Sequence, residues 1–248
     1  MELILNERAF AQQAIARGAV GRQPAQTLGC IARYLSQEGC EKPQIAGALH
    51  QFMQAHYADY NAVQWDQAIT RLAARADARP LLQADSIIVT QEELSIIRAL
   101  GSRPLERLGF TLLCLAKYAR LVNPENAGWV TQKWSALFRM AHVQAGQEKR
   151  AAMLHDLRGR GLIEFSRSVD NLHVRVLFFR PESEPACALD DFREPGLFYL
   201  ALQGERLIRC ACCGKLLRPK TNNQKYCPGC RSEMNLKKTL DRYHAAAF

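Results

Sequence analysis

The stretch of sequence that decides the C-terminal fold is Cys210-Ala211-Cys212-Cys213-Gly214, followed further on by Cys227-Pro228-Gly229-Cys230. Each Cys-x-x-Cys pair turns two thiolates toward one point. The intervening residues let the two turns face each other around a tetrahedral ion. Gly214 follows the first pair, at a position where such a turn often needs a positive φ. The spacing predicts one structural Zn²⁺, bound by Cys210, Cys213, Cys227 and Cys230.

Other uses of these cysteines fit the sequence less well. A disulfide framework suits a small secreted chain, whereas residues 1–6 are too short an apolar run for a signal peptide and lack a basic start. A redox-active Cys-x-x-Cys pair stands alone rather than twinned. Cys212 as a ligand would shorten the first spacing to one residue, so Cys210 is preferred. Because four sulfur ligands leave no open coordination position, the ion is expected to be structural rather than catalytic.

The composition is that of a folded chain without a membrane span. The 248 residues are enough for two or three small domains, and 48% of them are hydrophobic, which supports a substantial core. No apolar run approaches the roughly 18 residues needed to cross a bilayer. Nine cysteines, four of them at metal-binding spacing, fit a reducing compartment. A cytoplasmic location is therefore expected.

Positive charge is concentrated at the C-terminal end of the chain. The formal net charge is +9, and residues 205–248 hold 10 basic and 3 acidic side chains, which account for +7 of it. Four thiolates on one Zn²⁺ would lower the charge of this segment to about +5. A compact basic module is typical of phosphate-backbone binding, and the alternative is a basic tail that only adds solubility.

Residues 1–80 are predicted to form a small helical bundle. Apolar side chains recur at helical spacing in three stretches, which begin at Leu28, Ile45 and Trp65. Pro24 and Pro43 stand near expected helix starts, where a backbone N–H is not needed. The chain as a whole is expected to be mainly α with small β elements.

Residues 86–180 follow the element order of a winged-helix-like domain. Thr90-Gln91-Glu92-Glu93 has capping-box spacing, and a long helix that is apolar on more than one side starts at Pro104. Helices are then predicted over 134–141 and 147–158. A hairpin of 162–165 with 172–179 follows, turning at Asp170-Asn171. Helix, turn, helix and two-stranded hairpin is the order of a winged helix.

The winged-helix-like part offers two candidate contacts with nucleic acid. Helix 147–158 could enter the major groove, but its exposed side carries Glu148 and Asp156 and would not strongly attract phosphates. The hairpin is better supplied with cations, and Arg167 and Arg175 are its candidate phosphate ligands. Winged helices also serve as protein-docking modules, so a structural or docking role stays open.

Residues 181–204 are predicted to be an acidic linker followed by a docking segment. Prolines interrupt regular structure, and residues 180–195 hold five carboxylates. A solvated loop is expected there, and the alternative is that it shields the basic module when nucleic acid is absent. Leu197–Leu202 is a short apolar element expected to dock that module onto the rest of the chain.

Residues 205–248 are predicted to be a basic zinc-binding module, a zinc ribbon or a treble clef. A knuckle, a hairpin and a second knuckle at the start of a helix over 231–243 is the layout of a treble clef. The apolar side of that helix, Leu236, Leu240 and Tyr243, is expected to pack on the knuckles, and its basic side suits a phosphate backbone. The candidate nucleic-acid ligands here are Lys215, Arg218, Lys220, Lys225, Arg231, Lys238 and Arg242.

Parts of the chain resemble known families. The stretches Cys213–Lys220 and Gln224–Cys227 resemble the zinc-binding ends of uncharacterised phage and prophage-type proteins, and Thr90–Phe179 is compatible with the same group. This resemblance implies a DNA-associated role in replication or transcription control of a mobile element, with the same four cysteine ligands and no catalytic residue. Ala32–Leu35 and Trp65–Ile69 give the helical bundle a distant similarity to the small helical domain that follows the catalytic part of some primases.

These features together predict a non-catalytic, zinc-stabilised nucleic-acid-binding protein whose partner is DNA. The alternative is a protein–protein interaction adaptor that uses the winged-helix-like and zinc modules for docking. An enzyme is not expected, because the sequence has no phosphate-cradling Gly-rich loop and no G-x-S-x-G or H-E-x-x-H motif. No clear base-reading pair is present, so sequence specificity is not predicted.

Overall fold

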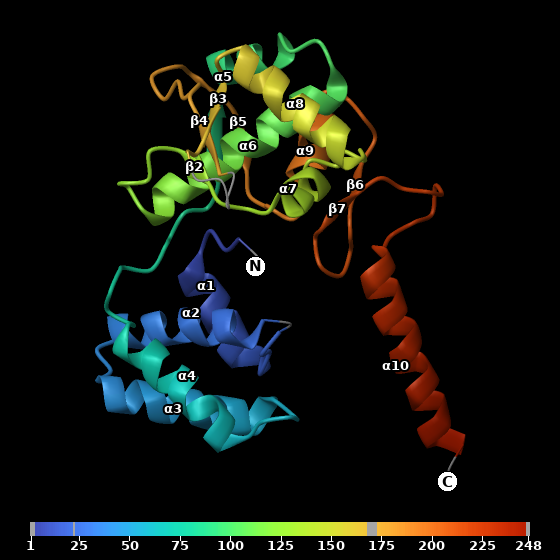
Figure 1. The fold of residues 1–248 in the computed structure, drawn as a ribbon. Coiled ribbons are helices and arrows are strands. Elements are labelled where there is room, and N and C mark those ends of the chain that lie inside the picture. The colour runs from blue at the N-terminus through green and yellow to red at the C-terminus, as the bar shows by residue number, and fades with distance from the viewer. Residues whose placement is uncertain (1–2, 22, 168–172, 247–248) are drawn as a thin grey trace. The chain divides into compact units, whose positions relative to one another are not determined.

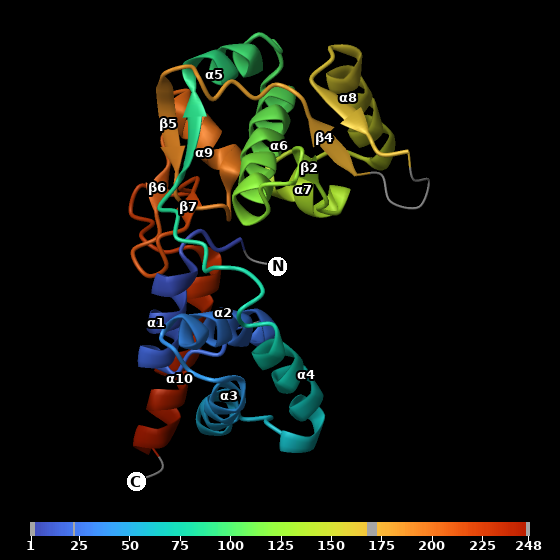
Figure 2. The same ribbon diagram turned by 90° about the vertical axis from the view of Figure 1, so that its left-hand side faces the viewer.

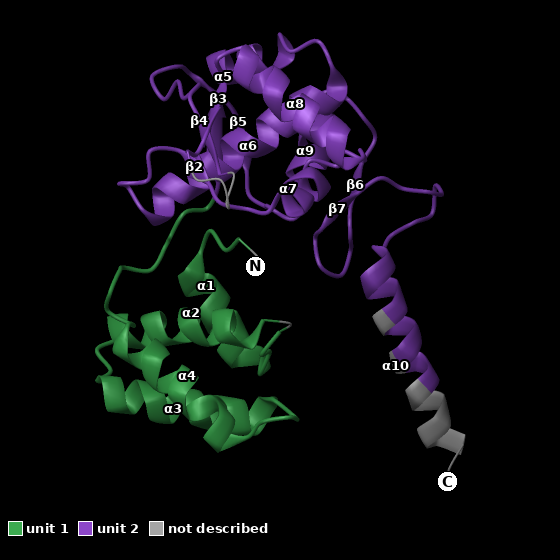
Figure 3. Ribbon diagram, viewed as in Figure 1, with its two compact units in different colours: residues 1–85 green, residues 86–248 purple. Residues whose placement is uncertain are grey.

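The computed structural model describes residues 3–21, 23–167 and 173–246, and in the last helix it leaves out the side chains of Glu233, Lys237 and the residues from Leu240 onward. The described chain is mainly helical with small antiparallel sheets, as the sequence predicts (Figure 1). It divides into two compact units, Met1–Asp85 and Ser86–Phe248 (Figure 3).

The first unit is built from helices whose starts are set by polar residues. Asn6 Oδ1 accepts a hydrogen bond from Ala9 N–H at 2.9 Å, and Asn61 Oδ1 accepts one from Val63 N–H at 3.0 Å. Such caps satisfy N–H groups that have no partner within the helix. The helices are α1 (Glu7–Arg17), α2 (Pro24–Gln37), α3 (Lys42–His56) and α4 (Ala62–Ala74).

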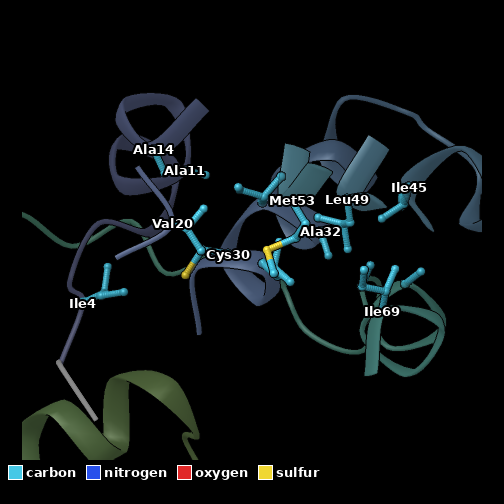
Figure 4. Packing of buried hydrophobic residues seen from close by; sticks show 14 residues of the cluster. Ile4, Ala11, Ala14, Val20, Cys30, Ala32, Ile45, Leu49, Met53 and Ile69 are labelled. Atoms are coloured by element: carbon cyan, nitrogen blue, oxygen red, sulfur yellow. The ribbon is translucent and has the colours of Figure 1, made fainter. Parts of the chain in front are cut away.

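Apolar residues at helical spacing form the core of this unit. Leu28 of α2, Leu49 of α3 and Ile69 of α4 are fully buried, and Figure 4 shows Leu49 and Ile69 among the side chains of the cluster. Burying each such side chain contributes about 1.5–3 kcal/mol. The predicted helical stretches from Leu28, Ile45 and Trp65 are therefore confirmed as helices that share one core.

A buried carboxylate ties the first unit to its exit segment. Glu7, 5% exposed at the start of α1, accepts hydrogen bonds from Arg33 Nη2 at 2.6 Å and from Arg79 Nη2 at 2.7 Å. The backbone N–H of Leu82 donates to Glu7 Oε2 at 2.9 Å. This carboxylate therefore joins α1, α2 and the segment that leads out of the unit.

The second unit is organised around the long helix α6 (Arg103–Val122). Leu108, Phe110 and Leu112 are fully buried, so α6 is covered on more than one side, as its sequence predicts. The preceding helix α5 (Gln91–Arg98) begins with the predicted capping box, in which Thr90 N–H donates to Glu93 Oε2 at 2.9 Å. Both features follow from local sequence.

A three-stranded antiparallel sheet packs against α6. Its strands are β2 (Trp129–Val130), β3 (Ile163–Phe165) and β4 (Val174–Val176), in the order β2-β4-β3. The helices α7 (Trp134–Met140) and α8 (Gln147–Gly159) fall between β2 and β3. The predicted pairing of the hairpin is confirmed by its register, and the predicted turn Asp170-Asn171 lies outside the described residues.

The expectation of a solvated loop is wrong for residues 185–189. Strand β5 (Pro185–Leu189) pairs antiparallel with β1 (Ile87–Thr90), and Ile88 stands opposite Ala188 (Figure 2). Pro185 is the first residue of the strand, a position that tolerates the missing N–H. The pairing joins residues about 100 positions apart, so local pattern did not indicate it.

The predicted docking segment is the helix α9 (Pro195–Leu202), which packs on α6. The ring of Tyr199 lies 5.3 Å from that of Phe110, and Tyr199 Oη donates to Glu106 Oε2 at 2.8 Å. A Cβ on Gly196 would lie only 2.3 Å from the carbonyl oxygen of Ala141, so α9 sits against the end of α7 as closely as glycine allows.

The C-terminal segment forms a hairpin and a terminal helix. Strand β6 (Ile208–Arg209) pairs with β7 (Leu216–Leu217), and α10 (Pro228–Ala246) follows. Leu236 of α10 is 62% exposed. The expectation that Leu236 packs on the knuckles is therefore wrong, because α10 runs beyond the small cysteine-centred cluster after its first turns. Leu240 and Tyr243, expected on the same side, lie outside the described side chains.

Candidate metal centre and basic groove

Four cysteines converge from the two predicted knuckles. The Sγ atoms of Cys210, Cys213, Cys227 and Cys230 all lie within 4.8 Å of one another. The Sγ atoms of Cys213 and Cys227, one from each knuckle, are 3.8 Å apart. Tetrahedral Zn²⁺ with Zn–S bonds of about 2.3 Å requires S–S separations of about 3.8 Å. The donor set and its spacing can therefore hold a metal ion.

The backbone conformation of the two knuckles brings the four sulfur atoms close together. In the first knuckle Gly214 adopts φ +71°, and its N–H donates to the Cys210 carbonyl oxygen at 2.8 Å. In the second knuckle Cys227 immediately precedes α10 and Cys230 lies in its first turn, and Arg231 N–H donates to the Cys227 carbonyl oxygen at 3.0 Å. The predicted need for a positive φ at Gly214 is confirmed.

Backbone donors favour the thiolate form of the first cysteine. Burial alone would raise the pKa of Cys210, but N–H groups of neighbouring knuckle residues, including Cys227 N–H at 3.2 Å, lower it to about 6. Hydrogen bonds to the thiols of Cys213 and Cys227 instead raise the pKa of Cys230. Because a metal ion binds thiolates and not thiols, a cation that binds this group displaces the remaining thiol protons.

Cys212 stays outside the cluster. It is exposed, whereas Cys210, Cys227 and Cys230 are buried and Cys213 is half-buried. Of the two candidates in the first knuckle, Cys210 thus joins the metal-ligand group and Cys212 does not.

The cysteine module is anchored by residues that precede α9. Arg193 Nη2 donates to the carbonyl oxygen of Cys213 at 2.8 Å, and Asp191 holds the same guanidinium at 2.7 Å. Glu194, with only 12% of its side chain exposed, pairs with both His142 and Lys215. The first knuckle is therefore joined through α9 to the helical body of the second unit.

Two predicted nucleic-acid ligands of the module are paired with carboxylates of the chain itself. Lys215 binds Glu194, and Arg218 binds Glu205. Part of the acidic segment thus contacts the basic module. Glu194 is largely buried and the Lys215 side chain is 38% exposed, so this pair ties the first knuckle to the segment before α9 and engages the Lys215 ammonium within the chain.

Four other predicted ligands line a groove of about 710 Å³, which we call the basic groove. Its first wall is the loop 220–226 and its second wall is the start of α10. Within the part of the chain whose side chains are described, none of the four forms an ion pair with a carboxylate. The four cations are Lys220 and Lys225 from the loop, and Arg231 and Lys238 from α10.

The remaining predicted ligands are distributed differently. Arg175 pairs with Glu164 at 2.9 Å and donates to the carbonyl oxygen of Ala127, so it braces the β3–β4 pair. Arg167 is exposed, and the side chain of Arg242 lies outside the described residues. On α8, Asp156 pairs with Arg160 at 2.7 Å, which leaves a mixed rather than basic surface.

The sequence did not indicate three uncharged members of the groove. Asn223, Tyr226 and Met234 line it beside the cations. The basic side of α10 was predicted from helical spacing. The loop 220–226 faces that side of α10 because the two cysteine pairs bring the ends of residues 214–226 together. No local sequence pattern predicts this approach.

Comparisons of the chain with protein-family models, with curated proteins and with solved structures gave no match. None of the helices in the described ranges combines the length and the hydrophobicity that a membrane crossing requires.

Proposed function

We propose that this chain is a non-catalytic, zinc-stabilised nucleic-acid-binding protein that holds a phosphate backbone in its basic groove. One observation carries the proposal: four cations line a single concave surface next to the cysteine cluster and form no ion pair among the described side chains. Clustered cations in a groove release counterions when they bind polyanions, which drives association.

Zinc is the proposed metal because the donor set is four sulfurs. Soft thiolates in a tetrahedral set favour zinc or an iron–sulfur centre, and a closed set of four leaves no position for substrate. The Cys213–Cys227 separation of 3.8 Å fits a single zinc ion. The arrangement of knuckle, β6–β7 hairpin and second knuckle at the start of α10 supports a treble clef over a zinc ribbon.

A winged-helix-like fold is proposed for residues 103–176. The order α6, β2, α7, α8, β3, β4 supports it, together with a sheet in which β4 lies between β2 and β3. The mixed charge of α8 argues against strong phosphate binding there. We assign the main contact with nucleic acid to the basic groove and a supporting role to this domain.

DNA is the proposed partner on the strength of the resemblance to phage and prophage-type proteins. A role in replication or transcription control of a mobile element fits that resemblance and a reducing, cytoplasmic setting. The nine cysteines, all of which lie in the described residues, form no disulfide bond.

Salt-titrated binding tests the proposed function. The variant Lys220→Gln with Lys238→Gln removes one cation from each wall of the groove. We expect weaker binding to a labelled oligonucleotide in fluorescence anisotropy. The slope of log K against log salt should become shallower by about 0.7–0.9 for each lost contact.

A matched variant controls for net charge. Arg71→Gln with Arg75→Gln removes the same charge from exposed positions at the end of α4, in the other unit. This control is expected to bind as the parent chain does. Equal losses in both variants, or binding that does not depend on salt, would exclude the basic groove as a polyanion site.

A protein-interaction adaptor is the second candidate function. The observation that favours it is a groove of about 470 Å³ between β1 and the end of α6, where Ile88 is 43% and Leu121 46% exposed. Large exposed apolar side chains beside a hollow often mark protein contacts. A partner that co-purifies with the chain and survives nuclease treatment would support this function, whereas a nuclease-sensitive one would support the first.

A further inference from the structure

We propose that the basic groove selects a single-stranded polynucleotide and stacks one of its bases on Tyr226. This inference rests on the proposed function and deepens it by naming the form of the nucleic acid. Three observations support it: the cations on both walls of the groove, the aromatic ring of Tyr226 and two side-chain amides.

Four exposed cations line one concave surface from two elements. Arg231 and Lys238 are seven residues apart on α10, which is two turns and about 10 Å along the axis. Both line the same groove as Lys220 and Lys225 of the facing loop. A backbone lying between the walls therefore meets cations on both sides. A flexible single strand can run between the two walls, as in single-strand-binding grooves that combine cations with an aromatic side chain.

Tyr226 supplies the groove with an aromatic surface. Tyr226 is half-buried, packs against the cysteine cluster and also lines the groove. Packing on one side limits the motion of the ring, so stacking a base on it costs little conformational entropy. Met234 lies in the same groove and adds an apolar contact. Stacking on an aromatic ring requires an unpaired base, which a single strand offers and an intact duplex does not.

Two amides are free to contact base edges. Asn223 and Asn235 line the groove, are exposed, and their side chains make no hydrogen bond to other described residues. Gln224 differs, because its Oε1 accepts from Lys220 N–H at 2.8 Å and its Nε2 donates to the Tyr226 carbonyl oxygen at 3.1 Å. Gln224 thus braces the loop, and the Watson–Crick edges of unpaired bases could meet Asn223 and Asn235.

The test compares one labelled strand in two forms with the full-length, zinc-loaded chain. Fluorescence anisotropy is measured with a mixed-sequence single strand, as DNA and as RNA, and with the same DNA strand annealed to its complement. We expect the single strands to bind at least about tenfold more tightly than the duplex at one salt concentration. Equal or tighter binding of the duplex would overturn the inference and leave the proposed function standing, whereas no binding of any form would remove both.

Substitutions at Tyr226 separate stacking from charge. Tyr226→Leu keeps an apolar side chain against the cluster and should weaken single-strand binding about tenfold, with metal content unchanged. Tyr226→Phe, which keeps the ring, should bind as the parent chain does. Single-strand affinity that is the same for all three chains would overturn the inference.

A second position keeps the test decisive if Tyr226→Leu loses its metal. Asn235 is exposed on α10, so Asn235→Glu places a carboxylate in the groove without removing a buried contact. Single-strand binding is expected to fall at least about tenfold, because the carboxylate repels phosphates. Undiminished binding would show that the strand does not enter the groove.

Discussion

Each cysteine of the second unit's cluster has a distinct environment, and the contrast between Cys230 and Cys212 can be tested. Cys230 is buried among the other three sulfurs, whereas Cys212 is exposed one residue away from Cys213. Cys230→Ser is expected to lose the bound zinc and Cys212→Ser to keep about one ion per chain, because only the former removes a ligand. Metal analysis by mass spectrometry after dialysis checks both. Retention of zinc by Cys230→Ser would exclude the four-sulfur site.

Glu7 is the corresponding key residue of the first unit. Glu7→Gln keeps the shape of the side chain but leaves Arg33, with 19% of its side chain exposed, without its anion. The expected loss is about 2–3 kcal/mol of unfolding free energy, somewhat below the value for fully buried pairs because Arg79 is a third exposed. Denaturant unfolding measures it. The matched control Glu38→Gln, in the exposed pair with Arg8, should cost less than about 1 kcal/mol.

The contribution of Glu7 also predicts a dependence on pH. Burial alone would raise the pKa of Glu7, but hydrogen bonds from Arg79 and Leu82 N–H and the charge of Arg33 hold it below the usual 4.5. A lowered pKa in the folded state stabilises the chain above pH 4.5 and stops doing so as the pH falls through the folded value. The stability difference between the parent chain and Glu7→Gln should therefore shrink on acidification. A difference that grows at low pH would contradict the assignment.

At the scale of elements, α9 links the cysteine module to the helical body, and its closest approach is at Gly196. Gly196→Ala would place a Cβ 2.3 Å from the Ala141 carbonyl oxygen, so either α9 or the end of α7 must move. The expected cost is at least about 2 kcal/mol. Gly47→Ala, in the open middle of α3 with no atom within 4 Å of the added Cβ, should instead stabilise the first unit by about 0.5–1 kcal/mol. Calorimetry of the full chain checks both, and a neutral Gly196→Ala would contradict the close packing.

Local signals predicted the elements they control directly. The Thr90–Glu93 capping box and the multi-sided burial of α6 follow from neighbouring residues and were predicted. The strands β1, β2 and β5 were not, because each is short and exists only through a distant partner, as Ile88 does with Ala188. Leu236 shows a second limit of sequence patterns. Helical spacing predicts which side of a helix is apolar, but it does not predict whether another element covers that side, and Leu236 is exposed.

The metal ligands were predictable in the same way, because two spaced cysteine pairs carry their own geometry. The groove was predictable only in part. Its cations are visible in the sequence, but charge alone does not reveal that Lys215 and Arg218 are paired within the chain while Lys220 and Lys238 form no ion pair with any described side chain. That division depends on the acidic residues on either side of α9, Glu194 before the helix and Glu205 after it, which contact the basic residues that follow.

For the whole molecule, the charge of the C-terminal segment and its metal site belong together. Residues 205–248 carry +7 of the +9 net charge, and three of their cations, Arg209, Lys215 and Arg218, are paired with Asp190, Glu194 and Glu205. The cations of the basic groove, which form no ion pair with the side chains that the structure describes, stand on the chain between and just after the two cysteine pairs. Under the proposed function, their convergence depends on closure of that loop by the metal ion.

The most direct measurement is oligonucleotide affinity of the full chain before and after removal of the metal with a chelator, followed by addition of one equivalent of Zn²⁺. We predict that affinity for a single strand falls at least about tenfold on removal and returns with Zn²⁺, because the groove walls separate when the thiolates lose their ion. Full affinity in a chain proved metal-free by mass spectrometry would contradict the account.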